Sequence, residues 1–390
     1  MGFFGKSAPV ETQPHYANPV LLPLDQPTAG AEPLPTAVLT DSQKATYDAM
    51  LNFLKGTEHG LTFSEKEQLY LTREQILRFL RATKWDLKKC QLRMLDNLKW
   101  RREYGVETLT AEHVEPEAIT GKQILLGFDN SCRPCLYLYP GRQNTEYSPR
   151  QMQHLVWMLE RTADLMPAGV ETLALLVNYR GATGAKSPPV SQGRETLALL
   201  QNHYVERLGR ALVIDLPVFI WGFFKIITPF MDPVTREKLI FNEELAKHVP
   251  PAQLDKHWGG QLEFEYKHAV YWPKLLELTQ KAQERAKRNW EAVGGGIGVS
   301  EALLKAEPSS SHTAVNGEKQ SQSATLSSEQ HEAVNQPGEE LSPEQSTQVV
   351  QQANQSDIVN RAEEKVDAVY VADSPAIVVK DQQASLKGVI

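Results

Sequence analysis

Two short segments have the residue types and spacing of known reactive sites. Cys132 and Cys135 form a CxxC pair, which is typical of redox and zinc sites, but no second pair follows and Cys135 begins an apolar run. Residues 181–187 (GATGAKS) look like a phosphate-binding loop, but their glycine and lysine are not adjacent, and Pro188 stops the helix that such a loop requires. No GxSxG, HExxH or kinase motif is present. We therefore expect no catalytic residue, no metal site and no cofactor.

Residues 211–241 (ALVIDLPVFIWGFFKIITPFMDPVTREKLIF) join an oily stretch to a charged turn. A strand at 212–215 leads into aromatic and aliphatic residues, among which Lys225 is the charged exception. Such a helix is either buried on every side, or it faces a lipid-filled cavity and a bilayer, as a movable gate. Asp232 and Pro233 then restart a helix as N-cap and first residue. The simplest interpretation of the charged turn that follows is that it faces solvent.

Such a segment needs a scaffold, and the apolar periodicity predicts one of the α/β class. Two helices come first: residues 73–82, and a longer helix that Asp86 caps and Gly105 ends. Short runs that are apolar on both faces then alternate with helical stretches, which predicts a mostly parallel or mixed sheet covered by helices. The predicted strands are 124–128, 135–139, 173–177 and 212–214, and the predicted helices between them are 149–166, begun by Ser148 and Pro149, and 192–208.

Composition and charge exclude several classes of protein. The chain has 390 residues, 41% apolar and 23% charged, and its three cysteines are too few for a disulfide framework. The longest apolar stretch, 212–231, is interrupted by charges and prolines, so no membrane span is expected. Residues 301–390 carry 14 acidic against 6 basic side chains, and the remainder carries 34 against 35. This nearly neutral remainder argues against nucleic-acid binding, and the lack of a leader favours the cytoplasm.

The two ends of the chain differ from the middle in composition. Residues 1–40 contain prolines that interrupt every periodic element, so we expect a Pro-rich disordered arm. Residues 300–390 are rich in Ser, Gln and Glu with the single aromatic Tyr370, so we expect an acidic disordered tail.

The middle of the chain contains five blocks that match one known family. They are FLRATKWD at 79–86, KWRREYG at 99–105, YVERLGRALVIDLP at 204–217, PFMDPVTREKLIF at 229–241 and LDKHWGG at 254–260. Together they resemble the CRAL-TRIO lipid-binding family, and within it the fungal phosphatidylinositol transfer protein of the secretory pathway and its drug-resistance-associated homologues. The resemblance implies a sheet that floors an apolar lipid pocket closed by a gate helix. The implied divisions are an N-terminal helical subdomain at 41–110, a lipid-binding domain at 111–272 and a C-terminal helix at 273–299.

The resemblance also implies which residues bind the lipid head group. The carboxylate that accepts hydrogen bonds from inositol hydroxyls falls on Glu206, and the hydroxyl and ammonium that hold the phosphodiester fall on Thr235 and Lys238. A structural ion pair between Glu206 and Lys238 is the alternative. Thr83 stands where the family has an arginine that helps to hold phosphate, and Lys84 is kept. The implied phosphate clamp is therefore weakened or rearranged.

The implied pocket differs from that of relatives that also bind phosphatidylcholine. Leu173 and Leu175 stand where those relatives carry hydroxyl residues. Leucine offers no hydrogen bond, and an unmet buried polar group costs about 1–3 kcal/mol, so we expect phosphatidylcholine to bind poorly and a sterol to be an alternative cargo. The remaining pocket and gate residues are expected to be Phe219, Trp221, Phe223, Phe224, Ile227 and Phe230.

The resemblance implies a carrier rather than an enzyme. We expect a protein that binds phosphatidylinositol as cargo, exchanges it between membranes and regulates phospholipid metabolism, with lipid kinases as candidate partners. The alternatives are a carrier of sterol or another small hydrophobe without a phosphoinositide role, and a lipid-responsive scaffold that acts through the acidic tail. The expected location is the cytoplasm, with peripheral association with the endoplasmic reticulum, lipid droplets or endosomes.

Overall fold

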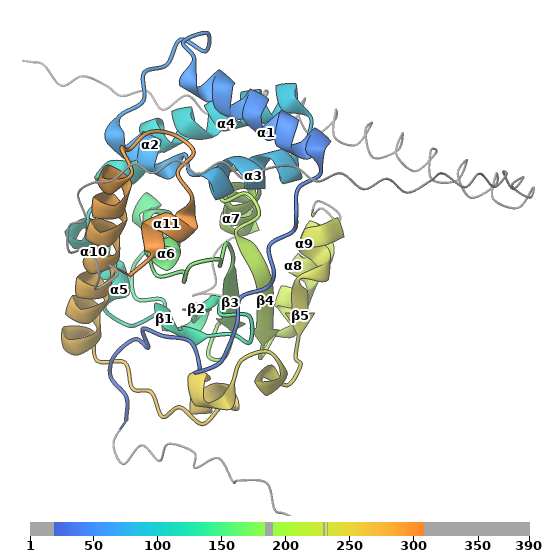
Figure 1. The fold of residues 1–390 in the computed structure, drawn as a ribbon. Coiled ribbons are helices and arrows are strands. Elements are labelled where there is room, and N and C mark those ends of the chain that lie inside the picture. Colours follow the sequence, from blue (N-terminus) through green and yellow to red (C-terminus); the bar gives the residue numbers. More distant parts are fainter. Residues whose placement is uncertain (1–18, 184–189, 229–230, 232, 308–390) are drawn as a thin grey trace, which may run out of the picture. The chain divides into compact units, whose positions relative to one another are not determined.

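The computed structural model describes residues 19–183, 190–228, 231 and 233–307. Four helices come first and pack around a core that includes Met50, Phe79, Leu80 and Met94 (Figure 1). Thr40 and Asp86 cap the first and last of them, and Gly105 ends the last in the left-handed conformation that glycine favours. The helices are α1 (Asp41–Lys55), α2 (Glu65–Tyr70), α3 (Arg73–Ala82) and α4 (Leu87–Tyr104).

A five-stranded sheet follows in the described part of the chain. Its strands lie side by side in sequence order; β1 and β2 are antiparallel, and the later neighbours are parallel. The predicted mixed, mostly parallel α/β sheet is confirmed. The strands are β1 (Gln123–Phe128), β2 (Pro134–Leu138), β3 (Leu173–Asn178), β4 (Leu208–Ile214) and β5 (Leu239–Phe241). Apolar periodicity did not predict β5, because three residues are too few to show an alternation.

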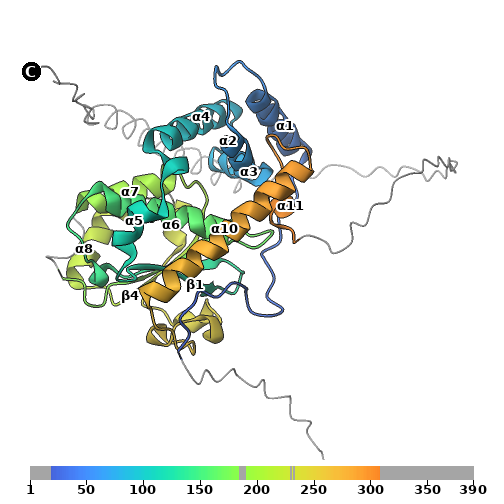
Figure 2. The same cartoon turned by 90° about the vertical axis from the view of Figure 1, so that its left-hand side faces the viewer.

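Helices cover one side of this sheet. Figure 2 shows α5, α6 and α7 on that side, with the segment of short helical turns at 245–258 on the other. The long helix α10 packs on α5 and α6, and the rings of Trp157 and Trp272 lie 4.9 Å apart between α6 and α10. No helix among the described residues has both the length and the apolarity of a bilayer span. The helices are α5 (Ala111–Ala118), α6 (Pro149–Asp164), α7 (Val190–Asn202), α8 (Val218–Ile227), α9 (Pro233–Glu237), α10 (His268–Ala292) and α11 (Glu301–Lys305).

Two predicted helices differ from those observed. The helix expected to reach residue 208 ends at Asn202, and residues 203–207 form a loop instead. Glu206 has a φ of +53° in this loop, a left-handed conformation that no helix accommodates. The helix of residues 149–166 begins at Pro149 as predicted, but the Ser148 side chain makes no capping hydrogen bond.

The described parts of both ends extend beyond the predicted boundaries. Residues 19–40, which we expected to be disordered, belong to the part of the chain that the structure describes. The Val20 N–H donates to the Glu263 carbonyl at 2.7 Å. Prolines keep this arm out of helices but leave it extended, so it can lie against the domain. At the other end, α11 lies within the stretch assigned to the acidic tail, and Glu301 is buried there. The expected tail boundary at residue 300 is therefore too early.

Candidate functional site

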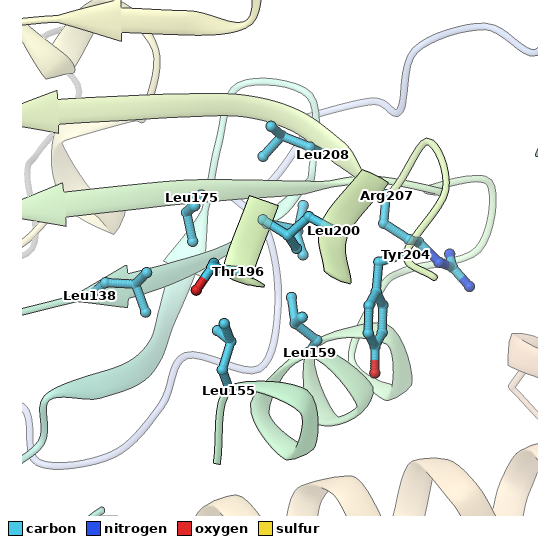
Figure 3. Close-up of a pocket in the computed structure, with 10 residues that line it drawn as sticks. Leu138, Leu155, Leu159, Leu175, Thr196, Leu200, Tyr204, Arg207 and Leu208 are labelled. Atoms are coloured by element: carbon cyan, nitrogen blue, oxygen red, sulfur yellow. The ribbon is translucent and has the colours of Figure 1, made fainter. Parts of the chain in front are cut away.

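An apolar pocket lies between the sheet and helices α6 and α7. Leu173 and Leu175 point to the same side of β3 because strand side chains alternate. Leu155 and Leu159 rise from α6 to meet them, one helical turn apart (Figure 3). The empty volume is about 400 Å³, including space open to solvent. Seven leucines line it among the described residues, at positions 138, 155, 159, 173, 175, 200 and 208, together with Thr196, Tyr204 and Arg207.

The polar groups at one end of this pocket are already engaged by protein partners. The Tyr204 hydroxyl donates to Glu160 Oε1 at 2.8 Å, and Arg207 Nη1 donates to the Glu171 carbonyl at 3.0 Å. Figure 3 shows the Arg207 guanidinium turned away from the leucines. Burial opposes ionisation of Glu160, but Arg101 outweighs it and lowers the pKa of Glu160 to about 2. The pocket interior therefore offers contacts to apolar groups.

The 203–207 loop, which carries Glu206, is held in place by the N-terminal helices. Asn97 Nδ2 donates to the His203 carbonyl at 3.1 Å, and the His203 ring stacks on Trp100 with 3.8 Å between ring centroids. Val205 is buried in the core of the N-terminal helices. Residues 203–207 thus form a loop because the N-terminal helices pack against them.

The Glu206 carboxylate is paired with an arginine of α3. Arg81 Nε donates to Glu206 Oε2 at 2.6 Å, and Arg81 Nη2 donates to Glu171 Oε2 at 2.9 Å. The Glu206 side chain is 32% exposed. Glu206 therefore forms its ion pair with Arg81. The alternative considered from the sequence was a pair with Lys238. Since Arg81 uses one carboxylate oxygen, the other can accept further hydrogen bonds.

Thr83 and Lys84 follow Arg81 at the end of α3. The Thr83 hydroxyl is shared between the carbonyls of Phe79 and Leu80, at 2.9 and 3.2 Å. Its proton is therefore used inside the helix, so Thr83 does not replace an arginine as a donor to phosphate. Lys84 has a φ of +52° in the turn that leads to α4. The Arg81–Glu206 pair brings this end of α3 next to the 203–207 loop.

Thr235 and Lys238 lie just before β5 in the chain. Thr235 is in α9, and its carbonyl accepts from the Lys238 N–H at 3.2 Å. The Lys238 carbonyl accepts from the Ala211 N–H of β4 at 2.8 Å. Because β4 and β5 are parallel, Glu206 and Lys238, which each precede a strand, lie toward the same edge of the sheet.

Helix α8, the expected gate, is neither fully buried nor fully exposed. Trp221 and Phe224 pack on Phe241 of β5, with ring centroids 5.2 and 5.0 Å away. Val218 is 87% exposed and Trp221 is 39% exposed. One side of the helix therefore faces solvent, which disagrees with burial on every side. The side chains of Phe219, Phe223 and Ile227, and the whole of Phe230, lie outside the described residues.

Sequence reasoning missed several residues that shape this site. Arg81 and Arg207 stand inside the matching blocks, next to residues that were selected, and only their position in the sequence pointed to them. Tyr204 begins one of the same blocks, whereas Glu171 carried no such signal. Their importance depends on contacts with Arg78, Arg81 and Glu160, which no short-range pattern reports.

Comparison with known proteins places the chain in a family. The CRAL/TRIO domain matches residues 119–260, and the CRAL/TRIO N-terminal domain matches residues 38–96. A CRAL-TRIO domain-containing protein of Schizosaccharomyces pombe is 49% identical over 293 residues, which are 73% of this chain and 29% of that protein. This chain therefore spans less than a third of that relative's length.

Two further relatives are matched over most of their length. A phosphatidylinositol transfer protein of Saccharomyces cerevisiae is 41% identical over 256 residues, which are 63% of this chain and 73% of that protein. The SEC14 cytosolic factor of Kluyveromyces lactis is 32% identical over 212 residues, which are 48% of this chain and 70% of that protein. With both domain matches and the mixed sheet described above, the chain belongs to the CRAL-TRIO family.

Proposed function

We propose that this protein binds phosphatidylinositol, transfers it between membranes and thereby regulates phospholipid metabolism. The observation that carries the proposal is the leucine-lined pocket, which ends at Tyr204 and Arg207 beside the half-exposed carboxylate of Glu206. The similarity to a phosphatidylinositol transfer protein of S. cerevisiae supports the same cargo. The role is that of a carrier, without a catalytic step.

The pocket has to shield acyl chains from water. Each hidden CH₂ group contributes about 0.8 kcal/mol, so a carrier needs a closed apolar space in solution. The empty volume of about 400 Å³ includes space open to solvent, so the enclosed part of the pocket is smaller than this. Two acyl chains therefore require the walls to move apart. We assign this movement to α8, whose exposed Val218 and Trp221 would enter the membrane interface as it swings away from Phe241.

The head group would be held at the edge of the sheet. The free oxygen of Glu206 would accept from inositol hydroxyls, and Thr235, Lys238 and Lys84 would face the phosphodiester. Arg81 keeps the Glu206 carboxylate in place. These assignments follow the family resemblance and the shared sheet edge described above.

Selectivity against phosphatidylcholine would come from the pocket wall. Leu173 and Leu175 line the pocket and offer no hydrogen bond to a choline phosphate. We expect the double variant Leu173→Ser, Leu175→Thr to gain phosphatidylcholine transfer.

A sterol, which brings one hydroxyl and no phosphate, is the alternative cargo. Lipid kinases that accept the presented phosphatidylinositol are candidate partners. The protein would be located in the cytoplasm and would contact membranes transiently.

Transfer of radiolabelled phosphatidylinositol between vesicles tests the proposal. We expect Glu206→Ala combined with Lys238→Ala to lower transfer at least tenfold, since two charge-assisted contacts of about 1.5–3 kcal/mol each are lost. The matched control is Glu263→Ala with Lys256→Ala, an exposed pair 3.8 Å apart elsewhere on the domain. Undiminished transfer by the first variant would show the head-group assignment to be wrong. A scaffold that acts through its acidic tail predicts instead that removal of residues 308–390 abolishes activity.

A further inference from the structure

The segment at 293–305 returns the chain from α10 to the N-terminal helices. The Gly298 N–H donates to the Leu71 carbonyl at 2.8 Å, and the Arg73 N–H donates to the Val299 carbonyl at 3.1 Å. The Glu301 N–H donates to Glu74 Oε2 at 2.6 Å. Helix α11 is thereby fixed against α3, although Glu74 and Glu301 are 227 positions apart in sequence (Figure 1).

Glu301 places a buried carboxylate between the N-terminal helices and the lipid-binding domain. Glu301 is 7% exposed, and its Oε1 accepts from Arg78 Nη2 at 2.6 Å and from the Thr72 hydroxyl at 3.0 Å. Arg207 Nη2 lies 3.5 Å from the same oxygen, and Lys305 Nζ lies 3.7 Å from Oε2. Burial opposes ionisation of Glu301, but Arg78 and Arg207 lower its pKa well below the usual range. Glu301 therefore binds one arginine of α3 and one that borders the pocket.

The contacts continue without a break from Glu301 to Glu206. Arg78, which is fully buried, uses Nη1 to donate to Glu171 Oε2 at 3.0 Å. Arg81 donates to the same Glu171 oxygen and, through Nε, to Glu206. A second connection is shorter, because Arg207 is the next residue after Glu206. Both connections fix the side chain and the backbone that present the Glu206 carboxylate.

We propose that Glu301 of α11 is a positioning residue for the lipid head group, acting through Arg78, Glu171 and Arg81 on Glu206. The inference rests on the proposed function, in which Glu206 accepts from inositol hydroxyls. Without the Glu301 charge, Glu171 is the remaining carboxylate partner of Arg78 among the described residues. Glu171 is then drawn toward Arg78, and its hold on Arg81, and so on Glu206, weakens. A segment beyond the two matched domains thus becomes part of the lipid site.

The test separates positioning from general stabilisation by comparing two lipids. Phosphatidylcholine vesicles contain either phosphatidylinositol or diacylglycerol with the same acyl chains, and binding of each is measured for the full-length protein. Glu301→Gln keeps the size and a hydrogen-bond acceptor but removes the charge. We expect it to lower phosphatidylinositol affinity about tenfold, within the range found for coupling through packed networks, and diacylglycerol affinity less than about twofold. Glu307→Gln, which breaks the exposed pair with Arg285, is the matched control and should change neither.

Each outcome decides something different. An equal loss for both lipids, or unchanged phosphatidylinositol affinity, overturns the positioning role of Glu301. A wild-type protein that binds phosphatidylinositol no better than diacylglycerol overturns the proposed function, and the inference falls with it. If Glu301→Gln does not fold, Lys305→Met perturbs the same carboxylate more gently, and we expect about threefold weaker phosphatidylinositol binding with diacylglycerol unchanged. Wild-type binding of both lipids by that variant also overturns the inference.

Discussion

The leucine pocket and the ion network beside it are built in opposite ways, although Arg207 belongs to both. The pocket takes side chains of one type from β2, β3, β4, α6 and α7. The network, Arg78, Arg81, Arg207, Glu171, Glu206, Glu301 and Lys305, joins charged side chains from α3, α11 and two loops. Any leucine-sized residue serves in the first, whereas each member of the second depends on the charge and position of its neighbours. The comparison teaches that the apolar wall and the charged network beside it have separate structural origins.

This difference has an energetic side. An apolar wall tolerates exchange among residues of similar volume, since its stabilisation scales with buried area. A buried carboxylate or guanidinium that loses its partner keeps its full desolvation cost. We therefore expect the network to respond more strongly to single substitutions than the pocket does, and the following predictions test this from the largest effect to the smallest.

Arg78→Ala should break the network most severely. Arg78 is fully buried and pairs with both Glu171 and Glu301, so its loss leaves the buried Glu301 with the longer contacts to Arg207 and Lys305. We expect the free energy of unfolding to fall by about 3–5 kcal/mol, measured by urea denaturation. Lys44→Ala, which removes an exposed pair with Asp41, should cost under about 1 kcal/mol. Similar costs for the two variants would show that the network does not hold these segments together.

Leu159→Ala should affect the pocket less than an equivalent change in a close-packed core. Leu159 already borders empty space, so fewer packing contacts are lost, and we expect a cost of about 2 kcal/mol. Leu80→Ala in the N-terminal core should cost about 4 kcal/mol, because Leu80 is completely enclosed. Urea unfolding of both variants gives the comparison. A larger cost at Leu159 would mean that the pocket wall is packed as tightly as the core.

His154 tests whether charge is tolerated on α6, which supplies one pocket wall. Burial, with a smaller contribution from Lys122, lowers the pKa of His154 to about 3, against about 6.5 in the unfolded chain. The unfolded state therefore binds the proton first, and stability falls as pH drops below 6.5 and continues to fall toward pH 3. Between pH 7 and pH 5 this group accounts for a loss of about 2 kcal/mol.

The variant His154→Leu should lack this loss. Thermal or urea unfolding at pH 7 and pH 5 compares it with the wild type. His203, whose burial and nearby Arg93 lower its pKa to about 4, contributes a similar loss, so the double variant His154→Leu, His203→Phe should show a still flatter profile. An unchanged difference between the two pH values in His154→Leu would show that His154 is not held neutral.

Trp221→Ala should have the smallest effect on stability. Trp221 is 39% exposed and has one described ring contact, with Phe241, so we expect a change under about 1 kcal/mol. Co-sedimentation with vesicles should nevertheless fall, because an aromatic anchor of the gate is lost. Leu92→Ala, which shortens an exposed apolar side chain on α4, should alter neither quantity. Unchanged vesicle association of Trp221→Ala would argue against α8 as the membrane contact.

Local patterns account for most of the fold. Helices at 73–82 and 87–104 and the first four strands follow from apolar periodicity and from capping by Asp86 and Gly105. The exception near the site is instructive. Residues 203–207 continue a helical pattern in sequence, yet they form a loop because Asn97 and Trp100 bind His203 and the N-terminal core takes Val205.

By itself the sequence determined the α/β class, the approximate positions of four strands and several helices, and the apolar character of the pocket wall, because alternation and helix capping act over a few residues. Only the tertiary structure decided which charges meet. Arg81 and Glu206 are 125 positions apart and Arg78 and Glu301 are 223 apart, so no short-range pattern pairs them. Ion pairs depend on the distance between charged groups in space, and packing of α3, α11 and the 203–207 loop sets that distance.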